Sequence, residues 1–563
     1  MKRALCLLVC LLWSAKASSQ AEAPPSGLDA SLADVIGESE PAQGLIDVYA
    51  DRRTGSVHWL LPAPDDEGLI GRYLYTARLA KGLGSNPVGL DRAGAGVTHI
   101  LRLHRVGSRI VAEAENMRFR ATAGGREAGS VDGSFATSVL WTAPIAAIGP
   151  EGALLVDAAT FLVRDAVGIT DRLENAGQGR FKLDAARSFV RAGAVLVFPD
   201  NVESQAVLTF TADDPGREVR ETAPTPAQIT LGVHHSLVKL PPPGFEPRPW
   251  DPRTGGIFPA SFADYSAPLD EPLIQRLALR HRLEKTDPQA DRSPVTEPIV
   301  YHVDPATPEP VRSALIEGAS WWADAFDAAG FEDAFQVQML PDGAHPLDVR
   351  YNMINWVHRQ TRGWSYGAAV VDPRTGEIIK GNVMLGSLRV RQDRMIFEAF
   401  LGAGGSDAAG NTPVEIALAR IRQLSAHEVG HTLGLAHNFT ASTYGRASVM
   451  DYPAPRIAIT DDGALDFSDA YDTGVGAWDR FAIRWLYSPV PEGADPRDHL
   501  DALAAEAVPD TMPYITDANA RSVSNAHPLA SLWDNGEDPV DELRHLMAVR
   551  RIGLDAFGPQ TLA

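Results

Sequence analysis

The chain has 563 residues, of which 45% are hydrophobic and 22% are charged, and its formal net charge at pH 7 is −21. A chain of this length and apolar content can bury cores in two or three domains, which excludes an intrinsically disordered protein. The strong negative charge repels nucleic acid and anionic membranes, so neither is an expected partner.

The first 17 residues have the pattern of a secretory signal peptide. Lys2 and Arg3 give it a basic start, an apolar run follows over residues 4–13, and an A-x-A cleavage motif ends at Ala17. We expect cleavage after Ala17 and a secreted or periplasmic protein. The apolar run is too short to span a bilayer, and no later stretch approaches the roughly 20 apolar residues that a spanning helix needs.

Both cysteines, Cys6 and Cys10, lie inside the expected signal peptide. The exported protein therefore has no disulfide and no thiol that could hold it in a latent form. Cys10 is also a candidate lipidation site, but the residues before it are large rather than small. Loss of the three basic residues of this segment takes the formal charge from −21 to −24. Export without disulfides is typical of the bacterial periplasm or exterior.

Two N-terminal regions follow. Residues 18–43 are small, acidic and rich in proline, which predicts a flexible leader. Over residues 44–240, short runs of β-branched and aromatic residues alternate with turn residues, which predicts a β-rich N-terminal domain. A short helix is expected over residues 184–192. His234 and His235 form an adjacent pair, but no third ligand stands at a recognisable spacing, so we expect a structural role for both.

Residues 241–297 combine many prolines with many charges, which predicts a connector that runs over the surface between two domains. A second domain is expected over residues 298–490. Its first elements are a strand over residues 299–303 and a helix that begins at Pro308 and stops at Gly330.

The second domain continues with strands over residues 335–340 and 349–356. A hairpin is expected next, with strands over residues 367–371 and 378–385. Thr412-Pro413-Val414-Glu415 has the form of a capping box and predicts the start of a long helix. A last helix of the domain is expected over residues 478–487.

The long helix contains the pattern H-E-x-x-H-x-x-G-x-x-H. His427 and His431 are four residues apart and project from one helix face, with Glu428 beside them. Gly434 can end the helix in a left-handed turn that brings His437 back toward the same point. Three neutral imidazoles with an open fourth position are typical of a catalytic zinc. The alternative is that these histidines lie on an ordinary helix without a metal. In that case all five fixed residues of the pattern would have arisen by chance.

These residues resemble the metzincin metalloproteases, whose signature continues with a methionine turn beneath the zinc. Here Ser448-Val449-Met450-Asp451-Tyr452 follows the third histidine, so the resemblance implies Met450 as the Met-turn residue. In astacin-like and serralysin-like members the matching tyrosine approaches the zinc, which implies Tyr452 as a fifth ligand or an oxyanion stabiliser. A tyrosine that only packs beside the turn is the alternative. Asn438 departs from the Ser, Asp or Glu that follows the third histidine in the best-known families.

The resemblance implies an α+β fold, in which a zincin catalytic domain follows the β-rich N-terminal domain. The catalytic domain would contain a twisted mixed sheet, a backing helix, the active-site helix and the Met-turn. The order of the motifs also resembles that of secreted bacterial zinc-dependent metalloproteases with large N-terminal domains. In that group the chain runs on as a helical region, so residues 491–563 are expected to be a C-terminal extension and Ala563 a candidate point of truncation.

The activity that the resemblance implies is that of a secreted zinc-dependent metalloendopeptidase acting on a peptide or protein substrate. One catalytic Zn²⁺ on His427, His431 and His437 would activate a water, with Glu428 as the general base. Metzincins hold the substrate extended along an edge strand above the active-site helix, so residues 378–385 are the candidate strand.

Two other function classes stay open. One is a zinc hydrolase of a non-peptide amide or ester. The other is a surface-binding protein with a vestigial metal site, although a binding module has no need of the base Glu428. The acidic stretch over residues 517–538 is a candidate calcium loop, but its ligands have no regular spacing, so a solvated loop is expected.

Overall fold

The structure is a computed structural model that describes residues 27–92, 96–257, 261–360, 363–402, 404–507, 511–521, 524–525 and 527–561. The expected signal peptide and the first part of the leader lie outside these ranges. Within them, every helix is too short or too polar to cross a membrane.

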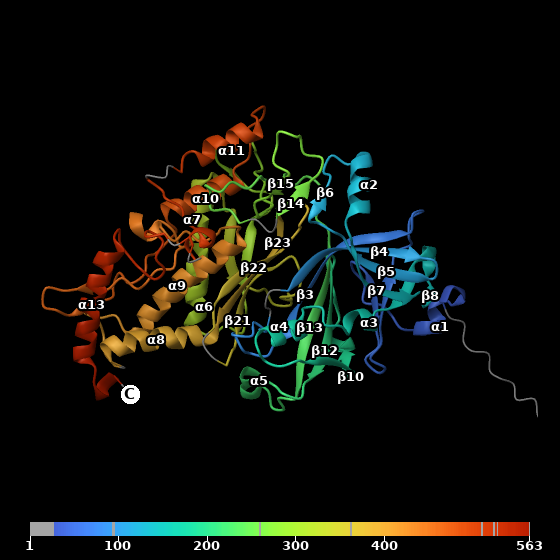
Figure 1. The fold of residues 1–563 in the computed structure, drawn as a ribbon, viewed down its shortest axis with the longest axis horizontal. Helices are drawn as coiled ribbons and strands as arrows, with labels where there is room; N and C mark the ends of the chain where they lie inside the picture. Colours follow the sequence, from blue (N-terminus) through green and yellow to red (C-terminus); the bar gives the residue numbers. More distant parts are fainter. Residues whose placement is uncertain are drawn as a thin grey trace, which may run out of the picture.

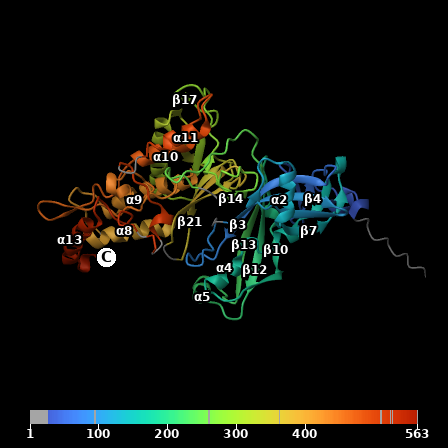
Figure 2. The same cartoon turned by 45° about the horizontal axis from the view of Figure 1, so that its top comes forward.

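The chain folds into two halves, each built on its own large sheet (Figure 1). The C-terminal sheet lies between the N-terminal sheet and three helices, as both views show (Figures 1 and 2). These helices are α6 (Val311–Ser320), α8 (Ser387–Leu401) and α9 (Pro413–Thr432). A β-rich first half and a second half of mixed sheet and helices confirm the predicted α+β class.

The N-terminal sheet has eight strands in the order β10-β12-β13-β3-β4-β5-β7, with β11 paired to β12. The strands are β3 (Leu69–Lys81), β4 (Val97–Val106), β5 (Arg109–Ala114), β7 (Ser138–Pro144), β10 (Lys182–Val190), β11 (Leu196–Val197), β12 (Asn201–Thr211) and β13 (Gln228–Lys239). Successive side chains of a strand point to opposite faces. One face, including Tyr75 and Leu237, enters the N-terminal core, so Thr76 and Ser236 face the other way.

Smaller elements cover the N-terminal core. A four-stranded sheet has the order β1-β2-β9-β8. Its strands are β1 (Asp47–Ala50), β2 (Val57–Leu61), β8 (Ala147–Ile148) and β9 (Leu154–Asp157), and the helices of this half are α1 (Leu32–Ile36), α2 (Gly125–Ser134), α3 (Ala159–Leu162), α4 (Ile169–Asn175) and α5 (Arg217–Thr222). Residues 27–43, expected to be flexible, fold against this sheet, with Ser31 bridged to Ile148 and Ala42 to Val48.

The helix expected over residues 184–192 is wrong, because residues 184–190 are part of strand β10. The pairing of β10 with β12 shifts register between Asp184 and Phe189, so the strand is bulged there. Within the bulge the Ser188 hydroxyl donates a 2.7 Å hydrogen bond to the carbonyl oxygen of Asp184. This hydrogen bond joins residues four apart, which is also the spacing in a helix. On either side of the bulge, however, the backbone of β10 pairs with β12.

The C-terminal sheet has six strands in the order β16-β23-β21-β18-β20, with β22 paired to β23. The strands are β16 (Arg280–His281), β18 (Ile299–Val303), β20 (Phe335–Met339), β21 (Asn352–Val357), β22 (Tyr366–Val371) and β23 (Glu377–Gly386). All pairings are parallel except that of β22 with β23. Strand β23 is paired on both sides, so residues 378–385 are not the free edge that the sequence predicted. Among the described residues β22 pairs only with β23, and it therefore presents the edge.

The helix expected from Pro308 to Gly330 is two helices, α6 and α7 (Trp322–Ala328). It begins three residues late because Glu309 precedes Pro310, and a residue before proline disfavours the helical region. The expected helix over residues 478–487 is α10 (Ala477–Tyr487). Other elements include β17 (Ser293–Pro294), β19 (Phe331–Glu332), β24 (Ala458–Ile459), β25 (Leu465–Asp466), α11 (Pro496–Ala504), α12 (Asp517–Ala520) and α13 (Pro539–Ala556).

The proline-rich connector is part of the folded body. Its strands β14 (Ser261–Asp264) and β15 (Ile274–Arg276) form a small sheet with β6 (Phe119–Arg120) of the N-terminal half. Strand β16, which lies in the same connector, pairs with β23 of the C-terminal sheet. The connector therefore joins both halves by backbone hydrogen bonds, and the C-terminal sheet begins before residue 298.

The two halves also contact each other directly. A small apolar cluster joins the N-terminal sheet to the C-terminal half through Leu74, Ile100, Val238, Val349 and Val370. A buried ion pair of 2.8 Å joins the Arg359 guanidinium to the Asp91 carboxylate. The N-terminal half thus packs against the C-terminal sheet on the side away from α6 and α9.

Candidate metal centre

Helix α9 begins as the sequence predicted. The Thr412 hydroxyl accepts a hydrogen bond from the Glu415 amide at 3.4 Å, and the Thr412 amide donates to the Glu415 carboxylate at 2.7 Å. This reciprocal capping box, with Pro413 at the first helical position, satisfies amides that have no partner inside the helix. The helix ends at Thr432, two residues earlier than expected.

The far end of α9 is held by side chains from three other elements. The last carbonyl groups of a helix have no partner within it. His281 of the connector donates to the Thr432 carbonyl at 3.0 Å, and Tyr487 of α10 donates to the Leu433 carbonyl at 2.8 Å. Tyr301 of β18 reaches the Thr432 hydroxyl at 2.8 Å. The end of the helix, and with it the motif, is therefore fixed by both the sheet and the connector.

Gly434 makes the turn after the helix possible. Its φ is +103°, and a Cβ built there would lie 2.0 Å from the Leu279 carbonyl oxygen, so only glycine fits. The Ile257 amide donates to the Gly434 carbonyl at 2.8 Å, and the Ala436 amide donates to the Gly255 carbonyl at 2.8 Å. The connector thus holds the turned chain in the direction that brings His437 back toward the helix.

The structure brings His427, His431 and His437 together. One nitrogen from each ring lies within 4.8 Å of the others, and the trio is the single group of its kind in the described part of the chain. The Nδ1 atoms of His427 and His431 donate to the carbonyl oxygens of Val449 and Leu435, each at 2.8 Å. His437 Nδ1 donates to the Asp517 carboxylate at 2.5 Å.

These partners leave each ring with a free lone pair at Nε2, which is the donor that a metal needs. The Nε2 atoms of His431 and His437 are 3.1 Å apart, close enough to share one cation. Burial lowers the pKa of His427 well below its usual value and that of His431 to about 3, so both rings are neutral. Three imidazoles oriented by outer partners fit Zn²⁺.

Asp517 was not among the candidate site residues. It lies 80 residues after His437, inside the stretch considered as a calcium loop, and no spacing rule connects the two. Burial raises the pKa of Asp517, but the hydrogen bond and charge of His437 outweigh it, and the pKa lies below its usual value. Parts of this segment are not a solvated loop, because Asp517 contacts His437 and Trp533 contacts Tyr452.

Asn438, the residue that departs from the known metzincin families, has a structural role here. Its amide nitrogen donates to the Tyr444 hydroxyl at 2.9 Å and to the Pro513 carbonyl at 3.3 Å. Its amide oxygen accepts from the Ile515 amide at 3.4 Å. The side chain of Asn438 therefore ties the segment before Asp517 to the end of the motif, which needs a donor and an acceptor on one side chain.

Glu428 lies beside the trio and is 4% exposed. Burial raises its pKa to about 8, while the Arg420 guanidinium and a hydrogen bond from the Gly367 amide act in the opposite direction. The carboxyl group is thus positioned by β22 as well as by its own helix.

Met450 lies beneath the helix, fully buried. A Cβ built on Gly430 would lie 2.3 Å from the Met450 sulfur and 2.7 Å from the Trp322 ring, so the glycine between the two helix histidines makes this contact possible. The Asp479 carboxylate holds the turn by accepting from the Ser448 hydroxyl at 2.6 Å and the Val449 amide at 2.9 Å.

Tyr452 packs against the histidines. Its ring centre lies 4.6 Å from that of His437 and 5.4 Å from that of His427. The Trp533 ring stacks on its other side at 5.0 Å. Burial raises the pKa of Tyr452, so its phenol is a hydrogen-bond donor at neutral pH.

The geometry agrees with a comparison against protein families. A family model described as Met-zincin matches residues 409–563, which include the histidine motif, the methionine turn and Asp517. Over these residues the chain is similar to the Met-zincin family. A domain of unknown function, DUF5117, matches residues 94–286. No curated protein and no solved structure gives a match.

The Met-zincin match runs beyond residue 490, where the sequence predicted the end of the catalytic domain. The contacts of Asp517 and Trp533 give the physical reason, because residues after 490 complete the surroundings of the trio. The pair His234 and His235 lies far from it. These two side chains point to opposite faces of β13, one to Glu203 and the other to the Tyr75 hydroxyl at 2.8 Å.

Proposed function

We propose that the protein is a zinc-dependent endopeptidase whose Met-zincin domain holds one Zn²⁺ on His427, His431 and His437. The observation that supports this most directly is the orientation of the three imidazoles. Each Nδ1 donates to an oxygen of the protein, and each Nε2 is left free toward one common point. When bound, zinc would supply a water acidified toward neutral pH and a positive charge that stabilises negative charge on oxygen.

Glu428 is the proposed general base. Its carboxylate would accept the proton of the attacking water and later return it to the nitrogen of the leaving amine. Burial from bulk water favours this transfer because it keeps the acid and base forms close in energy. The hydrogen bond from the Gly367 amide orients the carboxylate, so the base and the neighbouring strand are placed together.

Tyr452 is the proposed second donor to the oxyanion. A phenol that is protonated at neutral pH can donate a hydrogen bond to the oxygen that becomes negative in the transition state. The contacts of its ring with His437 and Trp533 would hold the phenol in place before substrate arrives.

The proposed substrate is an extended peptide, because in the described part of the chain β22 has an unpaired edge next to α9. An exposed strand edge can add a further strand by main-chain hydrogen bonds. The backbone of β22 lies directly on the motif, since a Cβ built on Gly367 would be 2.4 Å from the Glu428 carbonyl oxygen and 2.9 Å from the His431 Cβ. A peptide paired to β22 would therefore pass the histidines.

The test is digestion of a proteome-derived peptide library by the wild type and by Glu428→Gln. The variant removes the base without touching a histidine, so it should keep its zinc and lose at least about 10²-fold in kcat/KM. Glu415→Gln is the matched control on the same helix, since glutamine also serves in a capping box.

Two outcomes would overturn the proposal. If Glu428→Gln kept more than about a tenth of the wild-type rate, Glu428 could not be the base. If metal-loaded wild type cleaved no peptide but hydrolysed ester or non-peptide amide substrates, the chemistry would be that of a different zinc hydrolase.

A further inference from the structure

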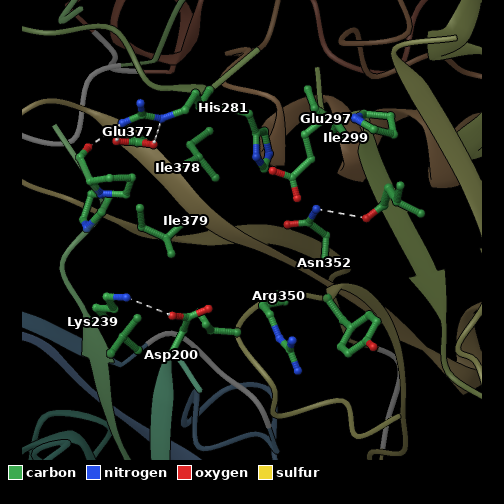
Figure 3. A pocket seen from close by; sticks show the side chains of 18 of the residues that line it. Asp200, Lys239, His281, Glu297, Ile299, Arg350, Asn352, Glu377, Ile378 and Ile379 are labelled. Atoms are coloured by element: carbon green, nitrogen blue, oxygen red, sulfur yellow. Dashed lines mark hydrogen bonds and ion pairs between the residues drawn. The ribbon is translucent and has the colours of Figure 1, made fainter. Parts of the chain in front are cut away.

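Two cavities lie between the halves, and both are lined by Val238 and Val349. The larger, of about 770 Å³, is shown in Figure 3. Its lysine and arginine side chains are paired within the protein. Lys239 pairs with Asp200 at 3.5 Å, and Arg282 pairs with Glu377 at 2.9 Å. These two cations of the larger cavity are therefore already paired with acidic groups of the protein.

The second cavity, of about 450 Å³, differs in its charged groups. The N-terminal sheet contributes one row of polar side chains to it. Arg78 of β3 is the cross-strand neighbour of His234 of β13, and Thr76 of β3 is the neighbour of Ser236. Ser236 is in turn opposite Glu203 of β12. These side chains share one face of the sheet, the face turned toward the C-terminal half.

The acid in this row is already satisfied. The Glu203 carboxylate, 2% exposed, interacts with the ring of His234, the hydroxyl of Ser236 and the side-chain amide of Asn201. These donors use the acceptor capacity of the carboxylate, so Glu203 has little left for Arg78.

Arg78 has no such partner. Among the described residues its guanidinium makes no hydrogen bond and no ion pair, although burial lowers its pKa and Glu203 acts on it only through its charge. The Thr76 hydroxyl beside it is buried and also lacks a hydrogen-bond partner within the described chain. A guanidinium has five N–H donors, and partly exposed Arg78 lines the cavity without a partner for them among the described residues.

The C-terminal sheet closes the cavity from the other side. Lys380 of β23 donates to the carbonyl oxygens of Pro346 at 2.6 Å and Asp348 at 2.9 Å, which leaves one donor of its ammonium. Asn382, two residues along the same strand, also lines the cavity. The apolar part of the lining includes Leu79, Leu196, Val238, Leu347, Val349 and Val370.

We propose that this cavity binds a small amphipathic carboxylate. The carboxylate would pair with the Arg78 guanidinium, whose planar fork matches it in two parallel hydrogen bonds. The apolar body would lie against the aliphatic side chains of both sheets. The volume is that of a pocket for a small organic ligand. Because the lining comes from both halves, the bound molecule would hold the halves together, independently of the proposed peptidase activity.

The test is calorimetric titration of the full chain with sodium hexanoate, sodium acetate and inorganic phosphate. Hexanoate should bind, and acetate should bind at least about tenfold more weakly because it lacks most of the apolar body. Phosphate has the charge without that body and should also bind weakly. Phosphate binding as tight as that of hexanoate, or no heat with hexanoate, would overturn the proposal.

Arg78→Met removes the guanidinium and keeps an unbranched side chain. The Kd for hexanoate should rise by about 10-fold to 100-fold. Arg72→Met is the control on the same strand, because Arg72 pairs with Glu115 outside the cavity. Equal hexanoate affinity in the wild type and Arg78→Met would contradict the assignment.

A structural role for Arg78 predicts a different result. Removal of a charge that has no partner among the described residues should leave the Tm of the ligand-free protein unchanged or higher, whereas loss of a structural arginine would lower it. Arg78→Lys keeps the charge but not the fork, and its Kd should fall between those of the wild type and Arg78→Met. If Arg78→Lys bound hexanoate as tightly as the wild type, two parallel hydrogen bonds from a guanidinium would not be needed for binding.

Discussion

The histidine trio and the smaller interdomain cavity both gather polar side chains inside the protein. They differ in which groups, lone pairs or N–H donors, are left without a partner among the described residues. In the trio every Nδ1 donor has an acceptor, so only the Nε2 lone pairs are left. In the cavity Glu203 already accepts several hydrogen bonds, and the donors of Arg78 have no partner among the described residues. Free lone pairs fit a cation, and free N–H groups fit an anion, so the unused groups indicate the charge of the ligand.

The two clusters also differ in how far apart their residues lie along the chain. The three histidines fall within eleven residues, and one distant contact, that of Asp517, completes their outer partners. The cavity instead combines strands β3, β12 and β13 of one half with β21, β22 and β23 of the other. The trio therefore depends on one helix and its turn, while the cavity depends on how the halves pack.

Loss of one histidine should give the largest effect. His437→Ala removes a ligand, so the zinc content should fall from about one per chain to a small fraction, and peptidase activity should be lost with it. Elemental analysis and a peptide assay on the same preparation measure both. His527→Ala, an exposed histidine, should keep both properties. Full activity in metal-free protein would contradict the proposed function.

Tyr452→Phe should lower kcat by roughly 10-fold to 10³-fold with a similar KM, because the phenol acts in the transition state and the ring still fills its pocket. Steady-state kinetics and Tm on one preparation test this. Tyr444→Phe is the contrasting variant, since the Tyr444 hydroxyl donates to the Pro513 carbonyl at 3.0 Å and its loss should lower Tm instead. An unchanged kcat in Tyr452→Phe would leave this tyrosine a packing role only.

Asp517→Asn should weaken zinc binding by about 10-fold to 100-fold, because an outer carboxylate orients its histidine and raises its basicity. Competition with a zinc chelator measures the affinity. Asp541→Asn, at an exposed acid on α13, should have no effect. Equal zinc affinity in Asp517→Asn and the wild type would show that His437 is oriented without this carboxylate.

The smallest effect concerns the cavity and its pH dependence. Burial lowers the pKa of Lys380 from 10.5 to about 7. Between these values the unfolded chain binds more protons than the folded one, so this group makes the folded state more stable as pH rises. The free energy of unfolding of the wild type should gain about 2 kcal/mol relative to Lys380→Met between pH 7 and pH 9. Urea titrations measure it, and a constant difference would place Lys380 in contact with water.

The sequence alone determined the local parts of the site. Helical spacing placed His427, Glu428 and His431 together, and the capping box at Thr412 fixed the start of the helix, because both depend on residues within one or two turns. The need for glycine at Gly434 followed in the same way. These predictions rest on distances along the chain, and neighbours in sequence are necessarily neighbours in space.

Only the tertiary structure decided the rest. Residues 378–385 read as an edge strand, but β23 is interior because β21 and β22 flank it. Asp517 reaches His437 across 80 residues, and His281 of the connector caps the end of α9. Arg78 has an ordinary place in an alternating strand, and only the packing of the two halves shows that it has no partner among the described residues. No local pattern specifies such contacts, because chain packing rather than spacing sets which distant groups meet and which bonds they leave unmade.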